Sequence, residues 1–445
     1  MAKKLSSVLG IDIGSHSIKV AEVKTSGNSA TVTAIGVVAT PEGAVDYSGV
    51  YNSDEVGKAL AEVLKASGAS STSAVVTIAG QQSVLVRVIP VPRMDVDKEL
   101  QSHMEWEISK NIPFAETTIQ SDYKVVEGGD PNSAEMDVVM AMAPQSAIDT
   151  IVDCIKKAGK KPYAIDVEPL GLARSMKSSY PQWAGENGVC IVDIGHSTTS
   201  INIYDQGNLV LPRPVPGGGE MVTRAIADAK QIGIQEAEDY KVGQFAISEE
   251  MAANQGFGDP FGNATQAFDG GFSVDAYSAA EPVSNATASM SPMDDLAIDP
   301  ITGLPIDQPT ESTAPTYAND PFSSSPAPEP AFVSDNLMMP VAAHSSDEDF
   351  GAVQGILEDL VGELQRSIDY YASRGGNVSR VVLCGGGSKL RGLSGYLSRS
   401  LNTPVEMYDA FSGLGFASKK VGMDYLNEHR QELAVAIGNG LHIAY

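Results

Sequence analysis

The sequence DIGSHSIKV occupies residues 12–20, and it follows the apolar run VLGI at residues 8–11. A closely similar stretch, DIGHSTTSI at residues 193–201, follows the apolar run VCIV at residues 189–192. Each stretch predicts a strand that ends in an aspartate, a tight turn of small residues, and a second strand that leaves as a hairpin. Backbone N–H groups in such a turn can bind an anion, and the aspartate can hold a hydrated divalent cation. The repeat therefore indicates two half-molecules that face each other across a polyphosphate.

Length, charge and cysteine content limit the class of protein. A chain of 445 residues is too long for one ordinary core, so we expect two lobes. The formal net charge of -26, with no basic stripe to offset it, argues against a nucleic-acid partner. No run of about 20 apolar residues occurs, so no direct membrane insertion is predicted. Three cysteines in apolar or small-residue surroundings predict buried reduced thiols and a cytoplasmic protein: Cys154, Cys190 and Cys384.

One segment, residues 249–349, differs from the rest in composition. It holds 17 Asp or Glu residues, no Lys or Arg, and 12 of the 25 prolines. Such a composition cannot bury enough apolar surface to offset the entropy of ordering, so we predict a disordered acidic insert. Short apolar islands at residues 301–306 and 337–341 leave docking open, although a simple tether is favoured.

Outside this segment, hydrophobic periodicity predicts strands that alternate with helices, which indicates an α/β fold with mixed sheets. The strands, besides the two hairpins, are predicted at residues 31–39, 84–89, 121–126, 136–143, 162–166, 208–213 and 381–384. The helices are predicted at residues 54–66, 97–110, 146–158, 220–230, 235–242, 353–371, 389–400 and 432–444.

Further motifs accompany the hairpins. The run CGGGSK at residues 384–389 follows a predicted strand, and bare glycine there would let a base or ribose lie against the backbone. The run PGGG at residues 216–219 leads into a helix that carries Thr223, which can close over phosphate or ribose; an ordinary glycine turn remains the alternative. Glu238 and Lys241 lie one helical turn apart, and they can hold a nucleoside or form a solvated ion pair.

In their order along the chain, these motifs resemble the actin/DnaK/sugar-kinase ATPase superfamily, and within it the PilM-type proteins of type IV pilus assembly. The resemblance covers nearly all of the chain except the insert. It implies an actin-like ATPase fold of two lobes, each with a mixed sheet and flanking helices. The first lobe would comprise residues 1–74 and 166–185, with an FtsA-like extra subdomain at residues 75–165. The second lobe would comprise residues 186–248 and 350–445, with a C-terminal helix that returns to the first lobe.

The resemblance also implies a site for ATP and Mg²⁺. Asp12, Asp193 and Glu168 would arrange Mg²⁺ and water, with the two aspartates as metal ligands. Glu168 precedes a predicted helix, so an acid that merely favours the helix dipole is the alternative. Lys19 would contact a β-phosphate, and the phosphate turns would be lined by Gly14, Ser15, His16, Ser17, Gly195, His196, Ser197 and Thr198. The other nucleotide contacts would come from Gly217, Gly218, Gly219, Thr223, Glu238, Lys241, Gly385, Gly386, Gly387 and Lys389.

For function, the residues favour an adaptor whose lobes close on ATP, with slow or no hydrolysis. A sugar kinase would need an acid–base set in the first lobe, and residues 54–166 supply no convincing one; His103 is predicted to lie on a surface. A small-molecule kinase and an FtsA-like filament-forming ATPase remain the alternatives. The chain stops directly after its last predicted helix, without a basic amphipathic appendage, which argues against direct membrane attachment.

The expected partner follows from the resemblance. PilM-type proteins bind an N-terminal cytoplasmic peptide of a PilN-like inner-membrane protein, which would place this chain in the cytoplasm, peripheral to the inner membrane. The pilus motor ATPases are further candidate partners, and a homo-oligomer is left open. Trp106 lies off the predicted apolar face of its helix, so it is free either to meet an apolar peptide side chain or to pack on a neighbouring subdomain.

Overall fold

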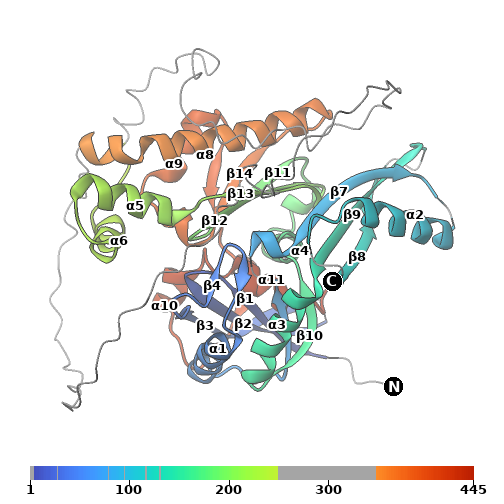
Figure 1. Cartoon of the computed structure of the whole chain (residues 1–445), viewed down its shortest axis with the longest axis horizontal. Coiled ribbons are helices and arrows are strands. Elements are labelled where there is room, and N and C mark those ends of the chain that lie inside the picture. The colour runs from blue at the N-terminus through green and yellow to red at the C-terminus, as the bar shows by residue number, and fades with distance from the viewer. Residues whose placement is uncertain are drawn as a thin grey trace, which may run out of the picture. The chain divides into compact units, whose positions relative to one another are not determined.

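The structure is a computed structural model that describes residues 5–27, 29–78, 80–94, 96–115, 118–129, 132–248 and 347–445. These residues belong to one compact unit (Figure 1). Most of the predicted acidic insert, residues 249–346, lies outside the described part of the chain. Its last three residues instead begin α8 (Asp347–Ser373). Asp349 ion-pairs with Lys230 at 2.7 Å and accepts a hydrogen bond from Tyr240, so acidic composition alone placed the end of the insert too late.

The first hairpin lies in a six-stranded sheet with the order β10-β6-β1-β2-β3-β16. The bounds of these strands are β1 (Ser7–Ile13), β2 (Ser17–Ser26), β3 (Ser29–Ala39), β6 (Ser73–Thr77), β10 (Lys161–Asp166) and β16 (Gly415–Phe416). β1 pairs antiparallel with β2 and parallel with β6. Alternate residues of β1, such as Leu9 and Ile11, pack against α1 (Ser53–Ser67) and α3 (Gln145–Lys157) on one face. This alternation is the period expected of a strand with two different faces.

The second hairpin lies in a sheet that repeats this order. That sheet runs β13-β12-β11-β14-β15, which matches β3-β2-β1-β6-β10 of the first. Its strands are β11 (Val189–Ile194), β12 (Thr198–Asp205), β13 (Asn208–Pro216), β14 (Arg380–Cys384) and β15 (Val405–Met407). One face packs against four helices: α5 (Gly219–Lys230), α6 (Ile234–Gly243), α8 and α9 (Leu393–Leu401). The hairpin repeat seen in the sequence is thus part of a repeat of whole sheets.

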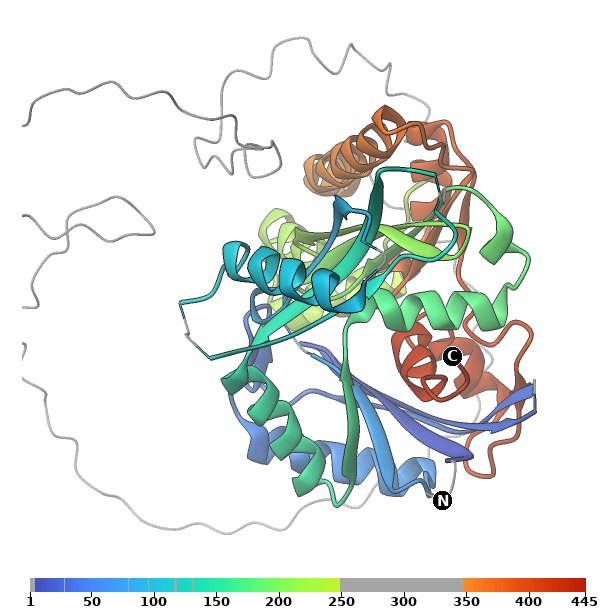
Figure 2. The same ribbon diagram turned by 90° about the vertical axis from the view of Figure 1, so that its right-hand side faces the viewer.

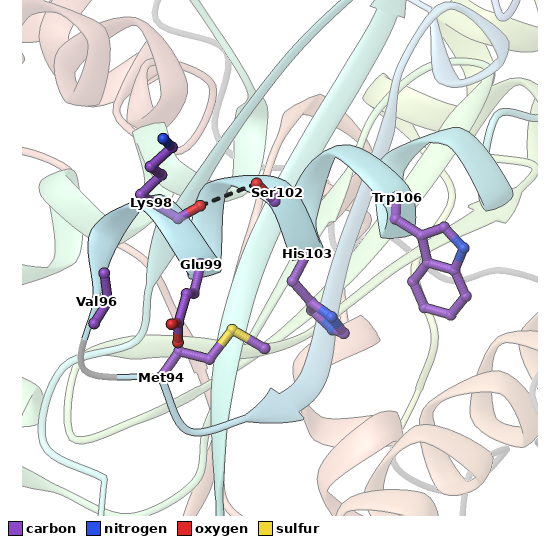
Figure 3. A pocket seen from close by; sticks show the side chains of 7 residues that line it. All are labelled: Met94, Val96, Lys98, Glu99, Ser102, His103 and Trp106. Carbon is purple, nitrogen blue, oxygen red and sulfur yellow. Dashed lines mark hydrogen bonds between the residues drawn. The ribbon is translucent and has the colours of Figure 1, made fainter.

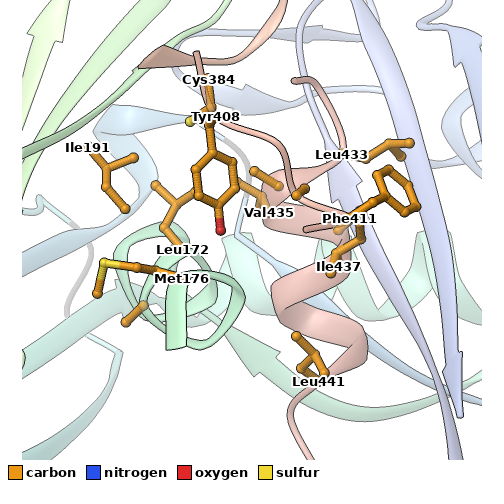
Figure 4. Close-up of a cluster of buried hydrophobic side chains, with 14 of the residues drawn as sticks. Leu172, Met176, Ile191, Cys384, Tyr408, Phe411, Leu433, Val435, Ile437 and Leu441 are labelled. Carbon is orange, nitrogen blue, oxygen red and sulfur yellow. The ribbon is translucent and has the colours of Figure 1, made fainter. Parts of the chain in front are cut away.

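A shared core joins the two sheets. Helices α4 (Glu168–Ser179) and α11 (Ala434–Gly440) pack against each other between the sheets (Figure 2). Their apolar side chains form one buried cluster with residues of both sheets (Figure 4), including Leu172, Met176, Ile191, Tyr408, Val435 and Ile437. α11 approaches β1 so closely that a Cβ at Gly10 would overlap the carbonyl oxygen of Ala436. Glycine at this position is therefore required for the packing of α11.

A third, smaller sheet has the order β7-β9-β8. It consists of β7 (Leu85–Pro92), β8 (Ile119–Val125) and β9 (Glu135–Pro144), and α2 (Asp97–Lys110) covers one face through the buried Met104 (Figures 1 and 2). The bounds predicted for the extra subdomain, residues 75–165, include elements that belong to the first lobe. β6 and β10 pair with the first sheet, and α3 packs on α1, because their apolar residues face that core.

The remaining elements are short. They are β4 (Val45–Asp46), β5 (Gly49–Val50), α10 (Met423–His429), and single 3₁₀ turns at Gln81–Ser83, Trp183–Gly185 and Gly386–Lys389. The helix predicted at residues 389–400 is in fact the last of these turns followed by α9, because Gly392 adopts a left-handed conformation with φ +83°. The three cysteines are buried and unpaired, as predicted. In the ranges that the structure describes, no helix has the length and apolar character needed to cross a membrane.

Candidate nucleotide site

The two hairpin turns are closed by equivalent backbone hydrogen bonds and contact each other. In the first turn Gly14 N–H donates to Ser17 O at 3.1 Å, and in the second Gly195 N–H donates to Thr198 O at 2.9 Å. The hydroxyl oxygens of Ser15 and Ser197, 182 positions apart in the chain, lie 2.8 Å from each other. The structure therefore brings the two predicted anion-binding turns to one place.

Two aspartates and a lysine meet beside the turns. Lys19 Nζ lies 3.1 Å from Asp12 Oδ2, and the two residues are directly opposite each other in the β1–β2 ladder. Burial alone would lower the pKa of Lys19, but the charges of Asp12 and Asp193 raise it. Burial, together with the charge of Asp12, raises the pKa of Asp193 to about 7. Both aspartates thus act on the same lysine from different sheets.

A third carboxyl group joins them from the start of α4. Glu168 accepts a hydrogen bond from Ser200 Oγ, and Ser200 Oγ in turn accepts one from Asn202 Nδ2 at 3.0 Å. Burial, and then the charge of Asp193, raise the pKa of Glu168 to about 8. An acid that only favours the helix dipole can remain exposed to solvent. The burial of Glu168 near the charges of Asp193 and Asp12 therefore favours a role in the site.

The PGGG run packs directly on the second turn. Gly217 N–H donates to Ser197 O at 3.2 Å, and Gly219 N–H donates to Gly195 O at 2.9 Å. Lys241 Nζ donates to Gly219 O at 3.1 Å, which ties α6 to the same run.

Thr223, Glu238 and Lys241 form one connected group. Lys241 Nζ lies 2.7 Å from both Thr223 Oγ1 and Glu238 Oε2, and Thr223 Oγ1 donates to Glu238 Oε2 at 2.6 Å. Burial would raise the pKa of Glu238, but the hydrogen bonds from Lys241 and Thr223 lower it. The pair is part-buried and anchored to the PGGG run, so it differs from a freely solvated ion pair.

The GGG run lies against the second aspartate. Gly385 has φ +81°, and a Cβ there would overlap Asp193 Oδ1, so the close approach requires glycine. Gly385 N–H donates to Gln431 O at 2.9 Å, and Lys389 ion-pairs with Glu432. Burial would raise the pKa of Glu432, but hydrogen bonds from His429 and Lys389 lower it to about 2. Lys389 is therefore engaged with a carboxylate in this structure.

Sequence reasoning missed three participants: Ser200, Asn202 and Glu432. Ser200 could have been predicted from the sequence, because it follows Asp193 by the same seven positions by which Lys19 follows Asp12. In the structure each of these residues lies opposite its aspartate in the ladder. Glu432 had none, since it reaches Lys389 only through the fold of the C-terminal segment.

The residues present fit Mg²⁺ bound together with a nucleotide. Hard carboxylate oxygens are the preferred ligands of Mg²⁺. Burial, and then the charge of Asp12, raise the pKa of Asp193, and a bound cation would oppose both effects. Within the described ranges, no three His, Cys, Asp or Glu side chains are grouped as a metal cage. Such a cage is not required, because nucleotide-bound Mg²⁺ uses one or two carboxylates, phosphate oxygens and water.

Comparison with known proteins assigns the family. The family described as "Type IV pilus assembly protein PilM" matches residues 10–261, more than half of the chain. The chain belongs to the PilM family. The family described as "Cell division protein FtsA" also matches, over residues 190–438. A PilM-family chain with an FtsA match in its second half agrees with the expected branch of the actin-like superfamily.

Solved and curated relatives support the same fold. The structure of a "PilM-PilN type IV pilus biogenesis complex" aligns with TM-score 0.68 and 19% identity over 99% of both chains. Cell division protein FtsA of Pseudomonas aeruginosa is 26% identical over 257 residues, 53% of this chain and 60% of that protein. FtsA of Neisseria meningitidis serogroup B is 27% identical over 97 residues, 22% of this chain and 23% of that protein. The chain thus spans 60% or less of these curated relatives, and the predicted actin-like ATPase fold is confirmed.

Proposed function

We propose that this PilM-family protein is an ATP- and Mg²⁺-binding adaptor of type IV pilus assembly, with slow or no ATP hydrolysis. The observation that carries the nucleotide part is the contact between the two turns, with Ser15 and Ser197 hydroxyls 2.8 Å apart, beside Asp12 and Asp193. Backbone N–H groups of both turns would bind phosphate oxygens, and Lys19 would supply a positive charge.

Asp12 and Asp193 would hold the Mg²⁺, which when bound neutralises charge on the phosphates. Glu168 would be the residue that acts on an attacking water. Ser200 Oγ donates a hydrogen bond to its carboxyl group. A hydrogen bond to a carboxylate lowers its basicity, so this contact supports slow turnover rather than efficient hydrolysis.

Isothermal titration calorimetry with Mg-ATP tests the nucleotide part. We expect Asp12→Ala and Asp193→Ala each to weaken binding at least about tenfold, because a charged ligand contact is lost. Asp122→Ala, an exposed change on β8, is the matched control and should bind like wild type. If both site variants also bind like wild type, the metal assignment is wrong.

For the partner, the similarity to a PilM-PilN complex supports the N-terminal cytoplasmic peptide of a PilN-like inner-membrane protein. Through this peptide the protein would be cytoplasmic and peripheral to the inner membrane. α2 and the loop that precedes it offer a pocket of about 840 Å³ for an extended peptide (Figure 3), lined by Met94, Val96, Lys98, Glu99, Ser102, His103 and Trp106.

Trp106 is the expected anchor of that peptide. Its side chain is 52% exposed, so it is not buried against a neighbouring subdomain. Lys110 Nζ lies 3.8 Å from the ring centroid, and the His103 ring lies 5.7 Å away, which restricts the orientation of the indole. An exposed, oriented tryptophan beside a pocket is a typical centre of a peptide-binding surface.

Fluorescence polarisation with a labelled PilN-like N-terminal peptide tests the partner part. We expect Trp106→Ala to weaken binding about tenfold or more, since such anchors contribute at least about 1.4 kcal/mol. Tyr370→Ala removes an aromatic ring that is 42% exposed on α8 and is the matched control. Wild-type affinity for Trp106→Ala would exclude this pocket, and no binding to wild type would exclude the adaptor function.

A further inference from the structure

Two histidines face each other where the hairpin turns meet. His16 belongs to the first turn and His196 to the second, and their ring centroids are 4.9 Å apart with the planes tilted by 34°. The serines beside them, Ser15 and Ser197, make the hydroxyl contact that joins the turns. Any polyphosphate held by both turns would therefore lie next to both imidazoles.

Two acidic side chains near this pair, Glu220 and Glu238, each already contact a basic side chain. Glu220 on α5 lies 3.6 Å from His196 Nε2, but its other oxygen accepts a hydrogen bond from Arg224 Nε at 2.8 Å. Glu238 on α6, which acts on both histidines, is held by Lys241 at 2.7 Å.

The surroundings consequently disfavour two positive imidazoles. Burial lowers the pKa of His196, and the charges of His16 and Lys241 lower it further, against the opposing charges of Glu220 and Glu238. A bound polyphosphate would reverse this balance, because it places several negative oxygens beside both rings and accepts charge-assisted hydrogen bonds from imidazolium.

We propose that His16 and His196 are a proton-linked clamp for the phosphates: binding of the polyphosphate is accompanied by proton uptake on this pair, so affinity rises as pH falls. The inference rests on the proposed nucleotide binding and adds a regulation of that site. The fraction of protein that binds nucleotide would then depend on pH as well as on the nucleotide concentration.

Calorimetry of Mg-ATP binding in two buffers of different ionisation enthalpy measures the protons taken up. Since Mg²⁺ would displace protons from Asp193 and Glu168, we expect wild type to take up more protons than a variant that lacks one of the two histidines, by a substantial fraction of one proton near pH 7. Because a terminal phosphate itself titrates near pH 6, the decisive quantity is the difference between proteins at equal pH.

Three variants complete the test. His16→Asn and His196→Asn should each reduce proton uptake and flatten the pH dependence of Kd relative to wild type. His442→Asn changes a histidine that pairs with Asp166 at 3.0 Å, outside the turns, and should keep the wild-type uptake. Circular dichroism verifies that each variant is folded, and the wild-type measurement stands even if one is not.

The outcomes separate the two proposals. If both turn variants exchange the same number of protons as wild type at equal pH, the clamp is wrong and the nucleotide site survives. If wild type binds no Mg-ATP between pH 6.5 and pH 8, the proposed function fails and the clamp fails with it.

Discussion

The two hairpins are alike in strand pairing but differ in the charge of one residue. Each has an aspartate at the end of its first strand, and the residue directly across the ladder lies seven positions further along. In the first hairpin that residue is Lys19, which ion-pairs with Asp12 at 3.1 Å. In the second it is Ser200, which donates its hydrogen bond to Glu168 instead.

This single difference gives the two hairpins different charges at the site. The first hairpin carries its own cation and suits an anion such as phosphate. In the second hairpin the uncharged Ser200 lies opposite Asp193. Burial raises the pKa of Asp193 to about 7 and that of Glu168, at the start of α4, to about 8. A repeated backbone therefore does not imply repeated chemistry, because the cross-strand residue sets the charge.

The largest effect should follow from removing the cation of the first hairpin. Lys19→Met would leave Asp12, Asp193 and Glu168 buried without it, and loss of one partner of a buried pair costs about 3–5 kcal/mol. Urea unfolding at pH 8 should show this decrease in the free energy of unfolding. Lys58→Met breaks an exposed ion pair with Glu55 and should change stability little. Equal effects of the two variants would contradict the comparison.

A second contrast lies two positions before each aspartate. The first hairpin has Gly10, against which α11 packs, whereas the second has the buried Ile191. Gly10→Ala should lower the free energy of unfolding by about 1–3 kcal/mol or more, because the new methyl group must displace the Ala436 carbonyl. Gly243→Ala, where a Cβ meets nothing within 4 Å, is the control for the substitution itself. Thermal melts of both variants make the comparison, which fails if Gly10→Ala melts like wild type.

The acidic side of the site should show in the pH dependence of stability. Since the folded pKa of Glu168 is about 8, above its unfolded value, its contribution is complete at pH 4 and is lost as pH rises through 8. Glu168→Gln cannot ionise, so its free energy of unfolding should rise relative to that of wild type between pH 5 and pH 8. Urea unfolding at pH 5, 6.5 and 8 measures this gain. A constant difference across that range would show that Glu168 is ionised in the folded protein.

The smallest effect should come from the contact between the turns. Ser15→Ala and Ser197→Ala should each lower the free energy of unfolding by about 0.5–1.5 kcal/mol, the usual contribution of one hydrogen bond. The double variant should cost less than the sum, since both changes remove the same 2.8 Å contact. Full additivity in this cycle would mean that the hydroxyls do not interact in solution.

Much of the fold was predictable because its signals are local. The predicted helix at residues 97–110 has the observed bounds of α2, since Leu100, Met104 and Ile108 repeat at helical spacing and pack on the third sheet. β6 was missed, because the short buried run AVVT at residues 74–77 carries no period that separates strand from helix. That miss also moved the predicted subdomain boundary into the first sheet.

The candidate site was only partly predictable. Both turns, both aspartates and Glu168 could be named from motifs, and the structure brings them together. The attachment of Lys241 to the carbonyl of Gly219, 22 positions away, and of Lys389 to Glu432, 43 positions away, has no counterpart in any local pattern. Such contacts depend on where the elements pack, which spacing within a motif does not encode.

The sequence by itself determined the two hairpins, the α/β class and the superfamily, because strand alternation, turn chemistry and motif order act over a few residues. Only the tertiary structure decided that the two turns touch, that His16 faces His196, and that Asp193 and Glu168 hold raised pKa values. Those properties depend on burial and on charges from distant parts of the chain, which only the packing of both sheets and their helices brings together.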